Sequence, residues 1–178
     1  MSFPNFSIEK KFSIPVVGVD EVGRGPLAGP VVSCALIFFK NIIENDKFYL
    51  INDSKKMTSK SRKIAYQYLF ELKNKKILDY SIGFSTIKEI DELNILEATK
   101  TSMLRSLKKL NFKNAHVIVD GNIDLKESFY PSTSIIKGDQ KSLSIAAASI
   151  IAKVHRDRYM RFLSYKFPHY GWEKNSGY

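Results

Sequence analysis

The chain has 178 residues, 44% of them hydrophobic, which is enough to bury one sizeable core and argues against an intrinsically disordered protein. No apolar run approaches the ~20 residues of a membrane-spanning helix, the N-terminus shows no pattern that points to export, and the one cysteine, Cys34, excludes an internal disulfide and a cysteine-rich zinc site. The formal net charge of +10 favours a polyanionic partner, either a nucleic acid or an acidic membrane surface. We therefore expect a single domain that works in the cytoplasm.

The first half of the chain predicts two strands, a helix and a third strand. Ile14–Val19 is rich in β-branched residues, and Pro30–Phe39 is apolar on both faces, as expected of a central strand. The segment EVGRGPLAG between them has three glycines and a proline, which predicts a tight turn. Thr58 can cap a helix over Ser59–Lys73, and the alternating pattern of Asp79–Ser85 predicts a strand.

The second half predicts alternating helices and strands. Thr86–Leu110 is mostly helical with a break near Asn94, and Ala115–Val119 is a buried strand followed by a turn signal. Ser134–Ile136 predicts a short strand, and Ser142–Phe167 predicts a long helix that Pro168 ends. Strands alternating with helices indicate an α/β fold, and the early hairpin-like pair predicts a mixed sheet with an antiparallel portion.

Four acidic residues lie where apolar elements end or begin. Asp20 and Glu21 terminate the first predicted strand, Asp120 terminates a buried strand, and Asp139 precedes the last helix. Each has a simpler interpretation, because Asp139 could cap its helix, Asp120 could serve a turn, and Asp20–Glu21 could be a solvated strand end. A cluster of carboxylates would repel itself unless it held a cation, and oxygen ligands suit magnesium or manganese. Two such ions could activate water and stabilise a leaving oxygen during phosphodiester hydrolysis.

One geometric condition applies to Asp20 and Glu21. Adjacent residues of a regular strand point to opposite faces of the sheet, so the two side chains can share a metal site only if the strand ends or bends there. The glycines at positions 23 and 25 make such a bend plausible.

Two further motifs suggest nucleic-acid contacts. Gly23-Arg24-Gly25 could bring backbone close to a sugar or phosphate while Arg24 binds a phosphate, although a turn with an exposed arginine fits equally. The loop of residues 52–56 carries Lys55 and Lys56, and taken alone it fits a solvated helix entry. His155 and Asp157 are better explained by ion pairing on a helix surface than by metal binding.

Together these segments resemble bacterial ribonuclease HII over about Val16 to the last residue. The segments are VGVDEVGRGPLAGPVV, NDSKKMTSKSR, IDELNILEAT, VIVDGN, KGDQKSLSIAAASIIAKVHRDR and FPHYGWEKNSGY. The resemblance implies a ribonuclease H-like fold, with a central mixed β-sheet flanked by helices. It also implies hydrolysis of RNA in RNA–DNA hybrids and 5′ to single ribonucleotides embedded in duplex DNA, a DNA-repair activity that leaves a 3′-hydroxyl and a 5′-phosphate.

The resemblance assigns roles to individual residues. It makes Asp20, Glu21, Asp120 and Asp139 the ligands of two Mg²⁺ or Mn²⁺ ions and the catalytic carboxylates. It makes the backbone of Gly23, Arg24 and Gly25 the reader of the 2′-hydroxyl, and Tyr178 the tyrosine that senses the RNA–DNA junction. Lys55 and Lys56 are the further expected substrate contacts. The related type three enzymes lack the Gly-Arg-Gly motif.

The end of the sequence departs from the family pattern. Asn175 and Ser176 replace the usual His-Lys pair, and the chain stops at Tyr178 where the family continues into further helix. We therefore expect one catalytic domain over residues 1–178 without that helical segment, a monomer, and a mobile Tyr178. The alternatives are a catalytically weak module that binds hybrid duplexes, and a basic α/β domain that binds a protein or membrane surface.

Overall fold

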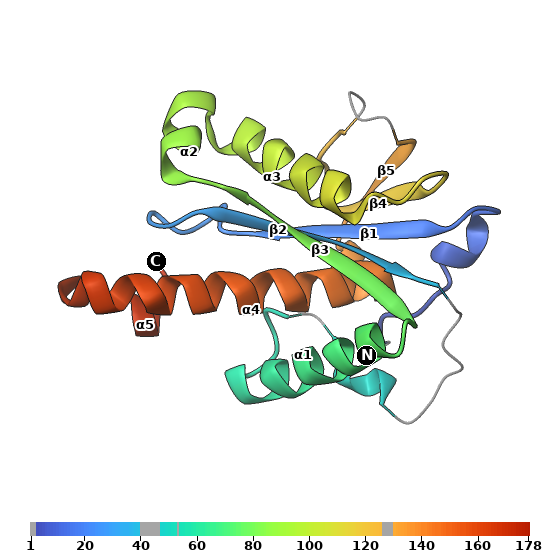
Figure 1. Ribbon diagram of the computed structural model, residues 1–178, viewed down its shortest axis with the longest axis horizontal. Coiled ribbons are helices and arrows are strands. Elements are labelled where there is room, and N and C mark those ends of the chain that lie inside the picture. The colour runs from blue at the N-terminus through green and yellow to red at the C-terminus, as the bar shows by residue number, and fades with distance from the viewer. Residues whose placement is uncertain (1–2, 40–46, 53, 126–129) are drawn as a thin grey trace.

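A five-stranded mixed sheet forms the centre of the computed structural model, which describes residues 3–39, 47–52, 54–125 and 130–178 (Figure 1). The strand order is β3-β2-β1-β4-β5. β1 pairs antiparallel with β2 and β2 with β3, whereas β1 with β4 and β4 with β5 are parallel, so the predicted mixed sheet is confirmed. The strands are β1 (Val16–Val22), β2 (Val31–Phe38), β3 (Leu78–Ser85), β4 (His116–Asp120) and β5 (Ser132–Ile135).

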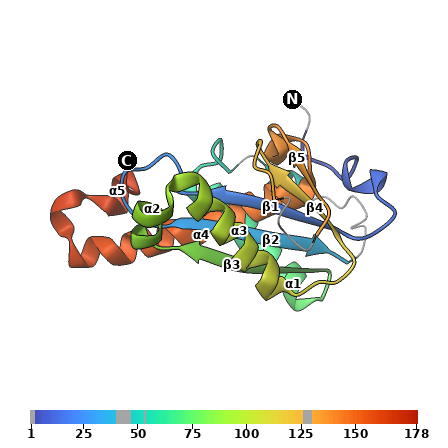
Figure 2. The same cartoon turned by 90° about the horizontal axis from the view of Figure 1, so that it is seen from above.

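Helices cover both faces of this sheet, with α2 and α3 on one side and α1 and α4 on the other (Figures 1 and 2). The short α5 lies beside the C-terminal part of α4. The α-helices are α1 (Ser59–Asn74), α2 (Ile87–Leu93), α3 (Ile95–Leu110), α4 (Leu143–Lys166) and α5 (Trp172–Asn175). The described 3₁₀ turns are η1 (Glu9–Lys11), η2 (Phe48–Leu50), η3 (Gly138–Gln140) and η4 (Pro168–Tyr170). Within the described ranges no helix is both long enough and apolar enough to cross a membrane.

The predicted helix boundaries agree closely with the structure, because side-chain caps set them. The Thr58 hydroxyl accepts the backbone N–H of Ser61 at the start of α1. Asn94, at φ +71°, separates α2 from α3 at the predicted break, and its side chain accepts two N–H groups at the start of α3. The predicted strands Pro30–Phe39 and Asp79–Ser85 are likewise confirmed to within one residue at each end.

The hydrophobic core lies in two layers, one on each side of the sheet. Leu36 of β2 packs in the layer under α1 and α4, whereas Ala35 and Ile37 pack in the layer under α3, so β2 is buried on both faces as predicted. Helix α4 crosses β1 closely at Gly18, where an added Cβ would lie 2.6 Å from the backbone nitrogen of Ile145. From this crossing α4 runs along β1, so that Ser149, about one turn after Ile145, lies beside Asp20.

The first strand is longer than predicted and corrects one expectation. We expected a strand over Ile14–Val19 that ends before Asp20, whereas β1 runs to Val22 and continues its pairing with β2. Asp20 lies opposite Cys34 and Glu21 lies opposite Ser33. Because Val31–Phe38 offers partners along this whole stretch, the pairing continues until Gly23.

Candidate active site

Asp20 and Asp120 lie beside each other on the two central parallel strands. The parallel register pairs Val19 of β1 with Val119 of β4, so the next residue of each strand is one of these aspartates. Asp20 is almost completely buried and Asp120 is half-buried. Burial raises the pKa of Asp20 well above its ordinary value, and the negative charges of Glu21 and Asp120 raise it further. The two acids that the sequence placed after buried strands therefore lie side by side in the sheet.

Asp139 is brought to this pair by the side chain of Asp120. The Oδ1 atom of Asp120 accepts the backbone N–H groups of Gly138 at 2.6 Å and of Asp139 at 3.3 Å. An added Cβ on Gly138 would lie 2.6 Å from Cδ1 of Ile145 and 3.2 Å from Oδ1 of Asp120, so a larger residue there would require Ile145 to move. The two simpler interpretations are therefore wrong: Asp120 binds backbone across the loop rather than in its own turn, and Ser142, not Asp139, caps α4.

Glu21 follows Asp20 on a strand that is still regular. Its Oε1 atom forms an ion pair with Nη1 of Arg24 at 3.3 Å, and its backbone N–H donates to Oδ1 of Asp20 at 2.7 Å. Burial, the largest influence, raises the pKa of Glu21. The charge of Arg24 lowers this pKa and the charge of Asp120 raises it, so Glu21 interacts electrostatically with both residues. The bend that a shared metal site was expected to require is absent, because the two acids lie in one continuous strand, although the charge of Glu21 still raises the pKa of Asp20.

The four carboxylates all act electrostatically on one lysine, but they do not form a finished coordination shell. Among the described residues, no three histidine, cysteine, aspartate or glutamate side chains are arranged to hold a metal ion. Nevertheless Lys55 interacts with all four: burial, the largest influence, lowers its pKa, and the charges of Asp20, Asp139, Asp120 and Glu21 together raise it above its ordinary value. Lys55 therefore lies within electrostatic range of all four acids.

The chemistry of these groups fits a divalent cation. Oδ2 of Asp20 and Oε2 of Glu21 are buried and accept no hydrogen bond from the residues that the structure describes. A buried carboxylate oxygen without a donor is costly, and either a proton or a cation relieves that cost. An all-carboxylate oxygen set is what magnesium and manganese prefer. The unbonded oxygens of Asp20 and Glu21 therefore fit a divalent cation in their chemistry.

The expected substrate contacts border these acids. The Gly23-Arg24-Gly25 turn follows β1 directly, and the ring of Tyr178 approaches within 3.6 Å of the position that a Cβ on Gly25 would occupy. Tyr178 is 73% exposed, but the residues before it are held, because the carbonyl of Gly177 accepts the N–H groups of Leu27 and Ala28 at 3.0 and 3.2 Å. These bonds do not support the expected mobility of the chain end.

Residues 54–56 form a turn before α1, the lysine turn, in which Lys55 and Lys56 are exposed. Asp53 of the same loop lies outside the described residues. Ser54 joins this turn to α4 through a hydrogen bond between its hydroxyl and that of Ser149 at 2.7 Å. Ser149 also forms a hydrogen bond that lowers the pKa of Asp20, against the larger effect of burial.

Sequence reasoning missed two residues of α4. Ser149 touches both the lysine turn and Asp20, and Arg156 is fully buried and bonded to the turn after β1. The only sequence signal for Arg156 is its place four residues after Ala152 and four before Met160, on the buried face of the helix. The predicted ion pair of Asp157 on the helix surface exists, and its partner is Lys153 at 2.6 Å.

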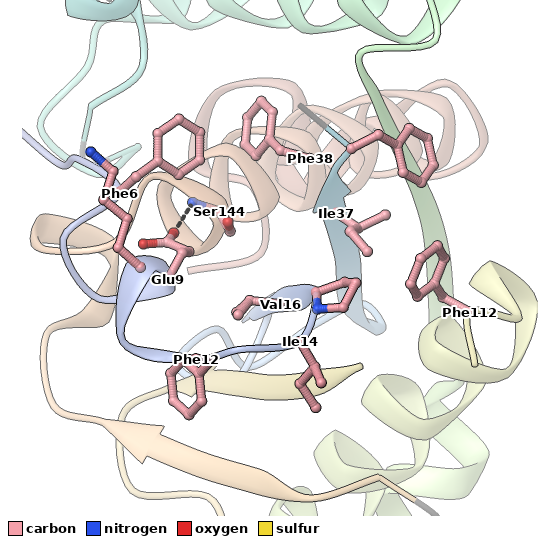
Figure 3. Close-up of a pocket in the computed structure, with 12 residues that line it drawn as sticks. Phe6, Glu9, Phe12, Ile14, Val16, Ile37, Phe38, Phe112 and Ser144 are labelled. Carbon is pink, nitrogen blue, oxygen red and sulfur yellow. Dashed lines mark hydrogen bonds between the residues drawn. The ribbon is translucent and has the colours of Figure 1, made fainter. Parts of the chain in front are cut away.

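A cavity of about 490 Å³ lies at the opposite end of β1 (Figure 3). It is lined by Val16 at the start of β1, Phe38 at the end of the antiparallel β2, and aromatic residues of the N-terminal segment. There the carboxylate of Glu9 accepts the N–H of Ser144 at 2.9 Å and tethers that segment to α4. This cavity is separate from the four acids.

The fold and site together define a ribonuclease H-like α/β protein, with acidic residues side by side on neighbouring central strands. A family model described as Ribonuclease HII matches residues 17–178. A Ribonuclease HII of Wolbachia pipientis subsp. Culex pipiens is 48% identical over all of this chain and 86% of that protein, and one of Fusobacterium nucleatum is 52% identical over 92% of this chain and 74% of that protein. The chain belongs to the ribonuclease HII family, and is thereby a metal-dependent endoribonuclease.

Solved structures agree with this assignment. The ribonuclease H2 of Pyrococcus horikoshii superimposes with a TM-score of 0.70 at 31% identity, over 92% of this chain and 80% of that one. The ribonuclease HII of Archaeoglobus fulgidus, solved in a complex with PCNA, gives 0.70 at 27% identity, over 86% and 78%. A ribonuclease HIII solved with Mn²⁺ gives 0.66 at 20% identity over 86% of this chain and 55% of that one, a likeness of fold alone.

Proposed function

We propose that this chain hydrolyses the RNA strand of RNA–DNA hybrids and cuts duplex DNA 5′ to single embedded ribonucleotides, leaving a 3′-hydroxyl and a 5′-phosphate. The observation that carries the proposal is the placement of Asp20 and Asp120 beside each other on parallel central strands, with the η3 turn bound to Asp120. Family membership supports the hybrid substrate. The compartment, the monomeric state and the single catalytic domain over residues 1–178 stay predictions from the sequence.

In this proposal Asp20, Glu21, Asp120 and Asp139 hold two Mg²⁺ or Mn²⁺ ions. When bound, such a pair supplies an activated water and stabilises the leaving oxygen of a phosphodiester. The chain itself fixes the ligands beforehand. The N–H groups of Gly138 and Asp139 fix the carboxylate of Asp120, while the buried oxygens of Asp20 and Glu21 stay available because no donor occupies them.

The substrate in this proposal lies across the Gly23–Gly25 turn and the lysine turn. The backbone of Gly23, Arg24 and Gly25 approaches the sugar that carries the 2′-hydroxyl, and the ring of Tyr178 beside Gly25 stacks at the junction. Lys55 and Lys56 neutralise phosphates, as the chain's net charge of +10 would favour. The groups that recognise RNA thus border the groups that cut it.

Cleavage of two substrates tests the proposal. A duplex with one ribonucleotide and a continuous RNA–DNA hybrid are incubated with Mg²⁺, with Mn²⁺ and with EDTA. We expect cleavage that EDTA abolishes, and Asp20→Asn should lower kcat by at least about 100-fold, since even residues that only orient metal ligands contribute about 10–100-fold. The exposed Asp91→Asn is the matched control. Tight binding without cleavage would instead favour a hybrid-binding module.

A further inference from the structure

Arg156 is a fully buried arginine whose hydrogen bonds go to backbone carbonyls. It is 0% exposed, and its Nε donates to the carbonyl of Pro30 at 3.0 Å, its Nη2 to that of Ala28 at 2.7 Å and its Nη1 to that of Ser176 at 2.7 Å. None of the ion pairs between described residues includes it. A buried guanidinium is costly unless it is well bonded, so its retention at this position requires an explanation.

The three acceptors belong to the two segments that carry the expected substrate contacts. Ala28 and Pro30 follow the Gly23–Gly25 turn, and Ser176 lies two residues before Tyr178. The rigid planar fork of arginine can hold several acceptors in fixed directions, which a lysine ammonium cannot do. One side chain of α4 thus binds the turn after β1 and the chain end at the same time, although 126 residues separate Arg156 from Pro30.

Two glycines of the segment after β1, Gly23 and Gly29, leave space for the side chain of Arg156. At Gly23, with φ +111°, an added Cβ would meet the carbonyl of Pro30 and would lie 2.7 Å from Nε of Arg156. At Gly29, with φ +92°, an added Cβ would lie 3.1 Å from Nη2 of Arg156 and would meet Met160. Gly23 therefore has a packing reason to be glycine that is independent of any substrate.

The two segments also bind each other directly. The N–H groups of Leu27 and Ala28 donate to the carbonyl of Gly177, and the Tyr178 ring lies against Gly25. On its other side the turn is joined to the candidate metal ligands through the ion pair between Arg24 and Glu21. A change in the turn would therefore alter Tyr178 and Glu21 together.

We propose that Arg156 is a positioning residue that locks the Gly23–Gly25 turn to Tyr178, so that the two form one surface for reading a single ribonucleotide. The inference rests on the proposed function for its substrate. A single ribonucleotide offers one 2′-hydroxyl, so its recognition depends on the relative placement of the two segments. A continuous hybrid offers many 2′-hydroxyls and a different groove, and depends on it less.

The test compares Arg156→Lys with wild type on both substrates, with kcat and KM measured separately. Arg156→Lys keeps the positive charge and removes the fork. We expect kcat/KM for the single-ribonucleotide duplex to fall by about tenfold or more, the scale of one lost hydrogen bond to a charged group, and hybrid cleavage to fall less. Arg158→Lys, an exposed arginine on the same helix, is the matched control and should leave the ratio of the two values unchanged. Arg156→Gln is the second variant if the lysine protein does not fold.

Two readouts separate positioning from general destabilisation. First, Arg156→Lys and Tyr178→Ala should be non-additive in the double variant, because both act through the same surface. Second, Trp172 is the only tryptophan and lies in α5, just before Ser176, so its quenching by acrylamide should increase in Arg156→Lys. A folded Arg156→Lys protein with an unchanged substrate ratio and unchanged quenching would overturn the inference.

Failure of the proposed function would be recognised separately. Wild-type protein that cleaves neither substrate with Mg²⁺ or Mn²⁺ would overturn that function. The Trp172 measurement needs no cleavage, so it would still decide whether Arg156 holds the turn and the chain end together.

Discussion

The Oδ1 atom of Asp120 accepts the backbone N–H of Gly138 at 2.6 Å, across 18 residues of chain. This bond fixes the η3 turn to the end of β4 and thereby brings the backbone of Asp139 to Asp120, the neighbour of Asp20. The carboxylate of Asp120 thus has a structural task in addition to the proposed chemical one, and two substitutions can separate the two tasks.

Asp120→Asn should abolish most activity while keeping the fold, because the amide oxygen can still accept the N–H of Gly138 but carries no charge for a metal ion. Asp120→Ala should lose the activity and also lower the free energy of unfolding by about 1–3 kcal/mol, since two buried N–H groups lose their acceptor. Urea unfolding and cleavage rates of both variants check the prediction. Equal stability of the two variants would show that the bond to Gly138 contributes little.

Asp20→Asn should stabilise the protein in the presence of EDTA. The pKa of Asp20 is raised in the folded state, chiefly by burial, so its contribution to stability is complete below the unfolded pKa and is lost as the pH rises through the folded pKa. At pH 7–8 the fold must bury this carboxylate either charged or with a proton taken up, and this destabilises the fold by an amount of about 1–3 kcal/mol for a buried group without its hydrogen bonds. Urea unfolding at pH 5 and pH 8 measures this. A larger advantage of the variant at pH 5 than at pH 8 would contradict it.

Divalent ions should reverse that order. Mg²⁺ or Mn²⁺ should raise the Tm of wild type, by an amount equivalent to about 2.7 kcal/mol when the ion is at 100 times its Kd. The increase should be mostly lost in Asp20→Asn and kept in the exposed control Asp91→Asn. Thermal unfolding across a Mn²⁺ titration provides the measurement. An increase of the same size in all three proteins would assign the ion to another part of the chain.

The lysine turn should contribute to the salt dependence of binding. In EDTA, Lys56→Gln should lower the slope of log affinity against log salt by about 0.9, the loss of one phosphate contact on a B-form duplex. Lys88→Gln provides the control, because Lys88 is 84% exposed and lies in α2, on the other face of the sheet. Fluorescence anisotropy between low and moderate salt measures both slopes. Identical slopes for Lys56→Gln and wild type would remove Lys56 from the binding surface.

The sequence predicted the elements well because local signals set them. Thr58, Asn94 and the run of apolar residues in β2 act through neighbours within a few positions, and those neighbours can be read directly. The end of β1 was missed because it depends on pairing with β2, a tertiary interaction that overrides the local turn signal.

The candidate site was only partly predictable for the same reason. Asp20 and Asp120 could be found, since they follow buried apolar runs on strands that lie together. The hydrogen bonds of Arg156 reach acceptors as many as 128 residues away, and no motif in the sequence distinguishes it from Arg158 and Arg161 of the same helix as the residue that makes them. The bond between the hydroxyls of Ser54 and Ser149 spans 95 residues and is equally hidden.

The position of Cys34 has a practical consequence. It is the only cysteine, it is 0% exposed, and it pairs with Asp20 across the centre of the sheet. A thiol reagent can reach its sulfur only when β1 and β2 separate or the layer beneath them opens. The rate of native-state labelling at Cys34 therefore reports the free energy of opening directly beside the proposed metal ligands, without any engineered probe.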